Sequence, residues 1–193
     1  MRLMYRIIDV LRFLMTSVNS YVYRKKIRSC GKAVRIEKLG KLIGGKYISI
    51  GDNSDIQQMT YLTAWDSCCG RNFHPRISIG NDCHIGAFNH ITSVNYIEIG
   101  DGFVSGKWVT ITDNAHGNTD INSLCMPVSK REIVSKGTVV LGKNVWLGDK
   151  VSIMPGVTIG DGVVVGANSV VTKNIPPYCV VGGNPARIIK KIK

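Results

Sequence analysis

The four histidines and six cysteines of this chain are its best-suited side chains for acid–base, nucleophilic or metal chemistry. They are His74, His84, His90, His116, Cys30, Cys68, Cys69, Cys83, Cys125 and Cys179. The group between Cys68 and His84 follows no established zinc spacing and the chain has no C-x-x-C pair, so we predict no metal site. The sequence shows no convincing pattern of a cleavable signal peptide. We therefore interpret the cysteines as reduced thiols of a cytoplasmic protein.

The net charge narrows the class of partner. The chain has 25 Lys and Arg against 13 Asp and Glu, a formal charge of +12. Such an excess attracts a phosphorylated cofactor, an anionic polysaccharide, a membrane surface or a nucleic acid. Few aromatic residues are interleaved with the basic ones and no recognition motif is present, so we do not expect nucleic-acid binding.

Residues 1–30 differ from the rest of the chain because they contain no glycine and repeat apolar residues at helical spacing. The apolar positions are Leu3, Ile7, Leu11, Leu14 and Val18. Asp9 and Arg12 interrupt the apolar run, so we do not expect a membrane-spanning helix. Two interpretations of this basic amphipathic segment stay open: it packs against its own protein, or it lies on an anionic membrane face.

A six-residue repeat organises the chain after residue 30 and must position any reactive group. Aliphatic residues recur at Leu141, Leu147, Ile153, Ile159, Val165 and Val171, and Ile99, Ser105 and Ile111 fall on the same phase. Two earlier blocks keep the six-residue spacing, at Ile50, Ile56 and Leu62 and at Ile79, Ile85 and Ile91. Each unit predicts one short strand with an inward anchor, followed by a tight turn built on Gly, Asn or Asp. Three units make a triangular coil of about 18 residues, and stacked coils bury a column of anchors.

Two interruptions of the repeat predict segments that leave the coil. The spacing breaks between Leu62 and Ile79, and again over residues 113–137. The second insertion is longer than a simple connection needs, and such loops often carry function. We expect both segments to line the pocket for an acceptor.

The C-terminal third carries motifs that resemble the hexapeptide-repeat acyltransferases. Residues 142–148 read GKNVWLG, 155–161 read PGVTIGD, 169–177 read SVVTKNIPP and 182–187 read GGNPAR. The match is strongest over 136–189, and it is closest to maltose, galactoside and nodulation-type sugar O-acetyltransferases and their capsule and O-antigen relatives. The resemblance implies a left-handed parallel β-helix, a homotrimer with active sites between subunits, and acetyl-CoA in the groove between two coils.

The expected organisation follows from the repeat and the resemblance together. We predict an all-β fold with an amphipathic helical segment at 1–30, a left-handed β-helix domain at 31–184 with its excursion at 113–137, and a basic C-terminal tail at 185–193. We expect the protein in the cytoplasm, with contact to the inner face of the membrane through residues 1–30 as the open alternative.

The resemblance implies that His116 is the catalytic base. It follows a strand end and opens the excursion, where the family places its histidine, although the sequence NAHG differs from the Thr-His-Pro of maltose-type enzymes. A base that removes the proton of a sugar hydroxyl is the minimum requirement for attack on a thioester. Asp113 or Asp120 is expected to orient the histidine. Asn89 aligns with an asparagine that shapes the acceptor site, or it is an ordinary turn residue.

The remaining site residues are assigned by their place in the matched motifs. The resemblance implies that Trp146 packs on the pantetheine arm, with a trimer-interface role as the alternative. It implies that Ala167 and Thr172 line the cofactor groove, and that Lys173 and Arg187 bind the phosphates of CoA. The other histidines do not match the metal ligands of carbonic anhydrases that share this coil.

We predict an enzyme that transfers the acetyl group of acetyl-CoA directly to a hydroxyl of a sugar or polysaccharide precursor. The enzymatic alternative is N-acetylation of a nucleotide-linked amino sugar or an antibiotic. The non-enzymatic alternative is a trimeric β-helix scaffold. The two insertions contain no recognisable code for the acceptor.

Overall fold

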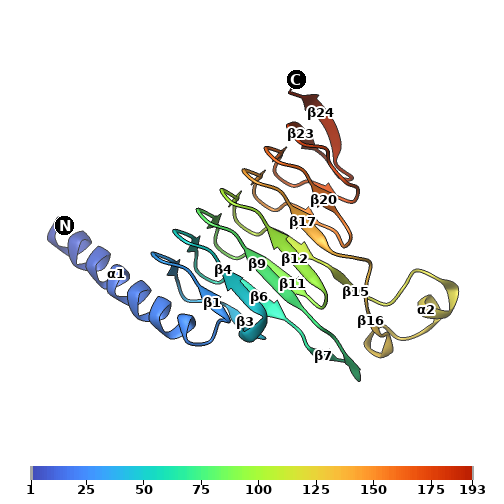
Figure 1. The fold of residues 1–193 in the computed structure, drawn as a ribbon, viewed down its shortest axis with the longest axis horizontal. Coiled ribbons are helices and arrows are strands. Elements are labelled where there is room, and N and C mark those ends of the chain that lie inside the picture. Colours follow the sequence, from blue (N-terminus) through green and yellow to red (C-terminus); the bar gives the residue numbers. More distant parts are fainter. Residues whose placement is uncertain (1, 193) are drawn as a thin grey trace.

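The computed structural model describes residues 2–192 and is a left-handed parallel β-helix preceded by one long helix (Figure 1). Helix α1 (Arg2–Arg24) is followed by a coil whose three sides are three parallel sheets. We call the sheets A, B and C in the order in which the chain visits them, and the corners between them A–B, B–C and C–A.

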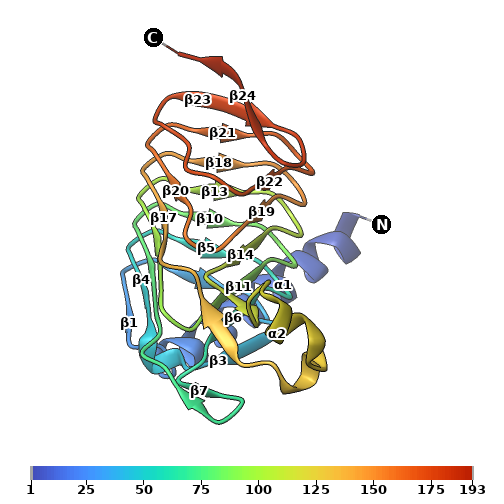
Figure 2. The same cartoon turned by 90° about the vertical axis from the view of Figure 1, so that its right-hand side faces the viewer.

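Each turn of the coil contributes one short strand to each sheet. Sheet A contains β1 (Ser29–Cys30), β4 (Ile48–Ile50), β9 (Arg76–Ile79), β12 (Tyr96–Ile99), β17 (Val139–Leu141) and β20 (Thr158–Ile159). Sheet B contains β2 (Arg35–Ile36), β5 (Asp55–Ile56), β10 (His84–Ile85), β13 (Val104–Ser105), β18 (Trp146–Leu147), β21 (Val164–Val165), β23 (Cys179–Gly182) and β24 (Arg187–Lys191). Sheet C contains β3 (Lys41–Ile43), β6 (Tyr61–Ala64), β11 (His90–Ser93), β14 (Thr110–Thr112), β19 (Ser152–Ile153) and β22 (Val170–Val171). Figure 2 shows β5, β10, β13, β18 and β21 stacked along the coil.

The predicted anchors form the core, which confirms the six-residue repeat. Ile50, Ile79, Ile99, Leu141 and Ile159 are buried one above another on sheet A. The corresponding anchors of sheets B and C are buried as well, including Ser105 at 3% exposure. The column therefore excludes water along the whole coil, which is the main source of stability in a repeat fold.

Side-chain oxygens at the A–B corner explain why Asp and Asn follow the turn glycines. Asp52 Oδ1 accepts a hydrogen bond from Lys32 N at 2.7 Å, and Asn81 Oδ1 accepts one from Asp52 N at 2.8 Å. Asp101 Oδ1 continues the ladder by accepting from Asn81 N at 2.9 Å. Each side chain satisfies a turn N–H of the preceding coil that the sheets leave unpaired.

Both interruptions of the repeat leave the coil at the C–A corner. The first forms a hairpin of β7 (Ser67–Cys68) and β8 (Arg71–Asn72). The second forms a hairpin of β15 (Asn114–His116) and β16 (Ile133–Ser135), whose connection holds the short helices α2 (Ile121–Cys125) and η2 (Val128–Lys130). A further 3-10 turn, η1 (Gly45–Tyr47), lies between β3 and β4.

The two ends of the coil are covered differently. The C-terminal part of α1 packs beside β2, and Tyr23 contacts the core. At the other end β24 folds back antiparallel to β23 (Figure 2), so most of the segment expected as a basic tail is a strand. Both ends thus protect coils that have no neighbour on one side.

Candidate functional site

His116 lies on the β15–β16 hairpin, close to the C–A corner. It is exposed and pairs in register with Ile133, which is buried and anchors the hairpin. Gly117 N donates to Glu132 O at 2.8 Å and extends the pairing past the histidine. Within residues 2–192 the His116 ring has no hydrogen-bond partner, so both of its nitrogens are free to meet a substrate.

The excursion encloses a hollow of about 300 Å³ that begins at Gly117, next to His116 in the chain, although His116 itself does not line it. Gly117, Lys130, Arg131 and Glu132 are among the residues that line it. Arg131 donates to the carbonyl oxygens of Met126 at 3.0 Å and Leu124 at 3.1 Å, which holds the connection around α2 in place. The hollow is therefore shaped by the excursion itself and is polar and cationic on one side.

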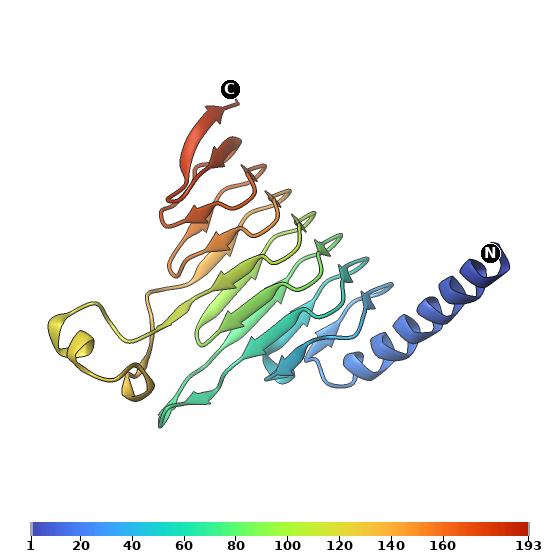
Figure 3. The ribbon, with the colours of Figure 1, turned by 180° about the vertical axis from the view of Figure 1, so that it is seen from behind.

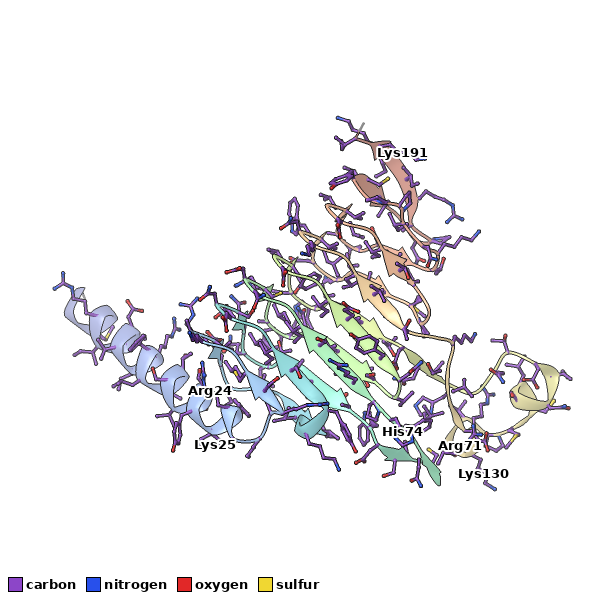
Figure 4. All side chains as sticks on the ribbon, viewed as in Figure 1. Arg24, Lys25, Arg71, His74, Lys130 and Lys191 are labelled. Atoms are coloured by element: carbon purple, nitrogen blue, oxygen red, sulfur yellow. The ribbon has the colours of Figure 1, made fainter. Side chains whose placement is uncertain are left out.

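An ion pair joins the two excursions. Arg71 Nη1 of the β7–β8 hairpin lies 2.8 Å from Glu132 Oε2 of the longer excursion. Figure 4 shows Arg71, His74 and Lys130 on this side of the coil. The sequence predicts that both insertions line one pocket, but it does not predict this ion pair. Its only signal in the sequence was that both insertions follow an anchor of the same sheet.

One glycine allows the excursion to return to the coil. Gly156 has φ +78° at the C–A corner, and a Cβ there would lie 2.7 Å from the carbonyl oxygen of Lys136. A side chain at 156 would therefore push the returning strand away from the corner.

The structure corrects the role expected for Asp113. Its carboxylate is fully buried and accepts from Ser93 Oγ at 2.6 Å, Val94 N at 2.9 Å, Asn95 N at 3.0 Å and Asn114 Nδ2 at 3.1 Å. It therefore fixes the preceding C–A turn rather than the catalytic histidine.

The expected alternative, Asp120, does not contact the histidine either. It caps α2 by accepting from Ser123 N at 2.9 Å and Ser123 Oγ at 2.8 Å. These hydrogen bonds, chiefly the one from the backbone N–H, lower the pKa of Asp120. No carboxylate of the same chain orients His116 among the described residues.

Asn89 is also corrected: it points into the coil and does not reach an acceptor. It is 1% exposed, its Nδ2 donates to Ser105 Oγ at 2.6 Å, and its Oδ1 accepts from Val109 N at 2.7 Å. Ser105 occupies an anchor position, and its hydroxyl makes room for this amide. The pair is an internal polar link between successive coils.

Trp146 and Ala167 lie together in a second hollow, on the B–C side of the coil. This hollow has a volume of about 430 Å³ and is also lined by Gly148, Asp149 and Val164. Trp146 is 54% exposed at an outward position of sheet B. Small residues at 148 and 167 leave the backbone accessible beside the indole, which suits an extended, partly apolar ligand.

The other three residues expected to bind the cofactor lie elsewhere on the coil. Thr172 and Lys173 are exposed at the C–A corner after β22, two strands along sheet C from β14. Arg187 is exposed at the start of β24 and pairs in register with Gly182. The single chain thus brings Trp146 and Ala167 together but leaves His116 and Lys173 on another edge.

Among the other histidines, His84 is the one held by a carboxylate. Its Nδ1 lies 3.0 Å from Asp55 Oδ2, and Asp55 Oδ1 lies 3.3 Å from Arg35 Nε. His90 packs edge-on against Tyr61, with ring centroids 5.9 Å apart. In residues 2–192 no three His, Cys, Asp or Glu side chains are grouped so that they could hold a metal ion.

Comparisons with known proteins agree with this architecture. Residues 138–173 match the family model described as bacterial transferase hexapeptide (six repeats). No curated protein matches the chain.

The solved structures that resemble it include the following three. A mutant of AntD, an N-acyltransferase from Bacillus cereus in complex with dTDP-4-amino-4,6-dideoxyglucose and coenzyme A, is 26% identical over 91% of this chain and 89% of that one, with a TM-score of 0.71. A maltose O-acetyltransferase from Clostridium difficile is 29% identical, with coverages of 96% and 84% and a TM-score of 0.62. A hexapeptide-repeat acetyltransferase from Vibrio cholerae, complexed with acetyl coenzyme A, is 25% identical, with coverages of 96% and 85% and a TM-score of 0.60.

The buried six-residue anchors, the matched repeats and these neighbours agree with the resemblance found in the sequence. Residues 138–173 thus carry the bacterial transferase hexapeptide repeat, and the chain is similar over most of its length to hexapeptide-repeat acyltransferases.

Proposed function

We propose that the protein transfers the acetyl group of acetyl-CoA directly to a hydroxyl of a sugar or polysaccharide precursor, with His116 as general base. The observation that carries this proposal is an exposed histidine with two free ring nitrogens on the excursion hairpin, whose neighbour Gly117 lines a polar hollow of about 300 Å³. Acetyl and acyl transfer by the structural neighbours, two of which hold coenzyme A or acetyl coenzyme A, supports the reaction class.

The chemistry needs one proton acceptor and one proton donor. The acceptor oxygen attacks the thioester carbonyl while His116 takes its proton, and the carbon–sulfur bond then breaks. His116 returns the proton to the departing thiolate, so the imidazole ends the cycle neutral. The free nitrogens of His116 fit both steps, and no covalent enzyme intermediate is required.

The positions of the two hollows support an active site between protomers. The groove of Trp146 and Ala167 lies on the B–C side of the coil, whereas His116 leaves at the C–A corner. One sheet of the same coil separates them. A cofactor in the groove therefore meets the histidine of a neighbouring copy more readily than its own, which is the arrangement that a homotrimer provides. Lys173 and Arg187 are proposed to bind the phosphates of CoA.

The second candidate function is N-acylation of a nucleotide-linked amino sugar. The similarity to AntD, whose structure holds dTDP-4-amino-4,6-dideoxyglucose, favours it. The coil and the base would be the same, because an amine and a hydroxyl both lose a proton during attack on the thioester.

The deciding experiment measures CoA release from acetyl-CoA with sugars, nucleotide sugars and amino sugars, for the wild type and His116→Ala. We expect an acceptor-dependent rate that falls about 10²–10⁴-fold in the variant. His74→Ala is the matched control, because His74 is also exposed next to an excursion. Alkaline hydroxylamine releases acetyl from an ester but not from an amide, so it assigns the product to O- or N-acetylation. An acceptor-dependent rate that survives His116→Ala would contradict the base assignment.

A further inference from the structure

Helix α1 meets the coil with its polar side. Ser20 is 8% exposed, and its Oγ accepts from Ile36 N at 2.8 Å. Tyr23 Oη accepts from Leu39 N at 3.1 Å, and Thr16 lines the small hollow between the helix and the coil. At about 100° per residue these three side chains share one side of the helix. The amphipathic pattern is therefore oriented opposite to that of an ordinary surface helix, whose apolar side faces its own core.

The apolar side of α1 faces away from the coil. Leu11, Leu14 and Val18 lie opposite Ser20 around the helix and are 53%, 53% and 62% exposed. The same outward arc includes Met4, Ile7, Ile8, Val10, Tyr21 and Val22, all exposed. Figures 1 and 3 show the helix projecting from the base of the coil with its N-terminal end far from it. An uncovered apolar strip of this length marks an interaction surface.

Basic side chains border this apolar arc on both sides. Arg6 and Arg12 flank it at opposite edges, each about 40° beyond the last apolar residue. Arg24, Lys25, Lys26 and Arg28 follow at the end of the helix, and Asp9 is the one acidic residue between Arg2 and Arg24. Within the described chain, none of these basic residues forms an ion pair.

We propose that α1 lies in the surface of an anionic lipid bilayer, with its apolar arc in the acyl region and its bordering arginines at the headgroups. An apolar arc with cationic edges is the pattern of a helix that lies in a membrane interface. The stem of Arg6 reaches toward the headgroups as the arc enters the bilayer, and Arg12, which also lines the hollow between helix and coil, borders the arc at its other edge. No helix within residues 2–192 has the length and apolar content to cross a membrane.

Charge favours the lipid over a second copy of the chain. Packing two α1 helices against each other would bring their cationic edges together with one aspartate each to offset them. Anionic headgroups neutralise these basic residues, and each basic residue near the surface strengthens the binding to the membrane. The inference is independent of the proposed function, because α1 contributes no residue to either hollow near His116 or Trp146.

The test is co-sedimentation of the full-length protein with vesicles of phosphatidylcholine alone or with added phosphatidylserine. We expect binding to the vesicles that contain phosphatidylserine, weakened by raised salt, and little binding to phosphatidylcholine alone. Leu14→Gln removes one apolar side chain from the arc and should weaken binding about tenfold or more. Ser17→Gln, three residues along the same helix and outside the arc, is the matched control and should change binding less than about threefold.

Sedimentation velocity of the same variants separates the lipid from a second copy. We expect the mass of the wild type and Leu14→Gln in solution to be equal. A wild type that fails to bind phosphatidylserine vesicles would overturn the proposal, as would a Leu14→Gln variant that binds them like the wild type. A mass that falls only in Leu14→Gln would assign the arc to contacts between copies. CoA release with a soluble acceptor should be unaffected by Leu14→Gln, so loss of vesicle binding is distinguishable from failure of the proposed activity.

Discussion

Nδ1 of His84 lies 3.0 Å from Oδ2 of Asp55 on the outer face of sheet B, which makes His84 the best-oriented histidine of the chain. Its Nε2 lies 3.3 Å from Nε2 of Gln57. An amide nitrogen only donates, so in this arrangement the Gln57 side chain donates to the His84 ring. Both nitrogens of His84 are thus occupied, whereas both nitrogens of His116 are free.

We therefore expect His84→Ala to keep at least about one third of the wild-type kcat/KM, against a loss of about 10²–10⁴-fold for His116→Ala. The Asp55–His84 pair is partly exposed, and such pairs contribute about 0–1 kcal/mol, so the Tm should change little. Steady-state kinetics of both variants checks this. Equal losses in the two variants would move the base to the face of sheet B.

The groove on the B–C side predicts that substitution of Trp146 changes the KM for acetyl-CoA. Trp146→Ala removes the aromatic wall beside Ala167 and should raise the KM for acetyl-CoA about three- to tenfold with a smaller change in kcat. Trp108→Ala is a close control, because Trp108 is equally exposed at 54% but stacks on Phe88 with centroids 4.3 Å apart, outside the groove. A Trp146→Ala protein with a normal KM and a smaller mass would assign the residue to the trimer interface instead.

Substitution of Asp113 is expected to lower the stability of the fold rather than to remove a catalytic group. Val94 N and Asn95 N donate to different oxygens of Asp113, so Asp113→Asn places an amide NH2 where one of these two N–H groups needs an acceptor. We expect the free energy of unfolding to fall by about 1–3 kcal/mol. Asp120→Asn should leave stability unchanged, because asparagine caps a helix as well as aspartate does. Urea unfolding of both variants measures the difference, and unchanged stability in Asp113→Asn would refute the structural role.

The sequence predicted the coil because one rule repeats along it. Each anchor, from Ile50 to Val171, needs only its own spacing to be assigned to the core, and the buried column bears this out. Both excursions leave the coil at the same corner because the anchors that precede them, Leu62 and Ile111, both belong to sheet C.

The site residues were harder to predict because their orientation depends on partners in other coils. Asn89 resembles a turn asparagine until Ser105, 16 residues later, is seen to leave space inside the coil. The Asp113 side chain points inward because it accepts hydrogen bonds from turn N–H groups about 19 residues earlier. For α1, the periodicity of Leu11, Leu14 and Val18 predicted an apolar face, but it contained nothing about which side Ser20 and Tyr23 would attach to the coil.

His90 predicts how stability changes between neutral and mildly acidic pH. Partial burial, with its ring edge-on to Tyr61, lowers the pKa of His90 below its usual value of about 6.5. Between the two pKa values the unfolded chain binds more protons than the folded one, so stability rises with pH and falls as the pH drops below about 6.5. His90→Gln removes this contribution. Its Tm should therefore fall less than that of the wild type between about pH 7.5 and about pH 5.5, and thermal melts at both values measure the difference. His74→Gln, at an exposed position, should follow the wild type. The carboxyl groups of Asp66, Asp101 and Asp120 have lowered pKa values and titrate below this window, so they do not interfere with the comparison. If His90→Gln loses as much Tm as the wild type over this range, a group other than His90 controls the loss of stability.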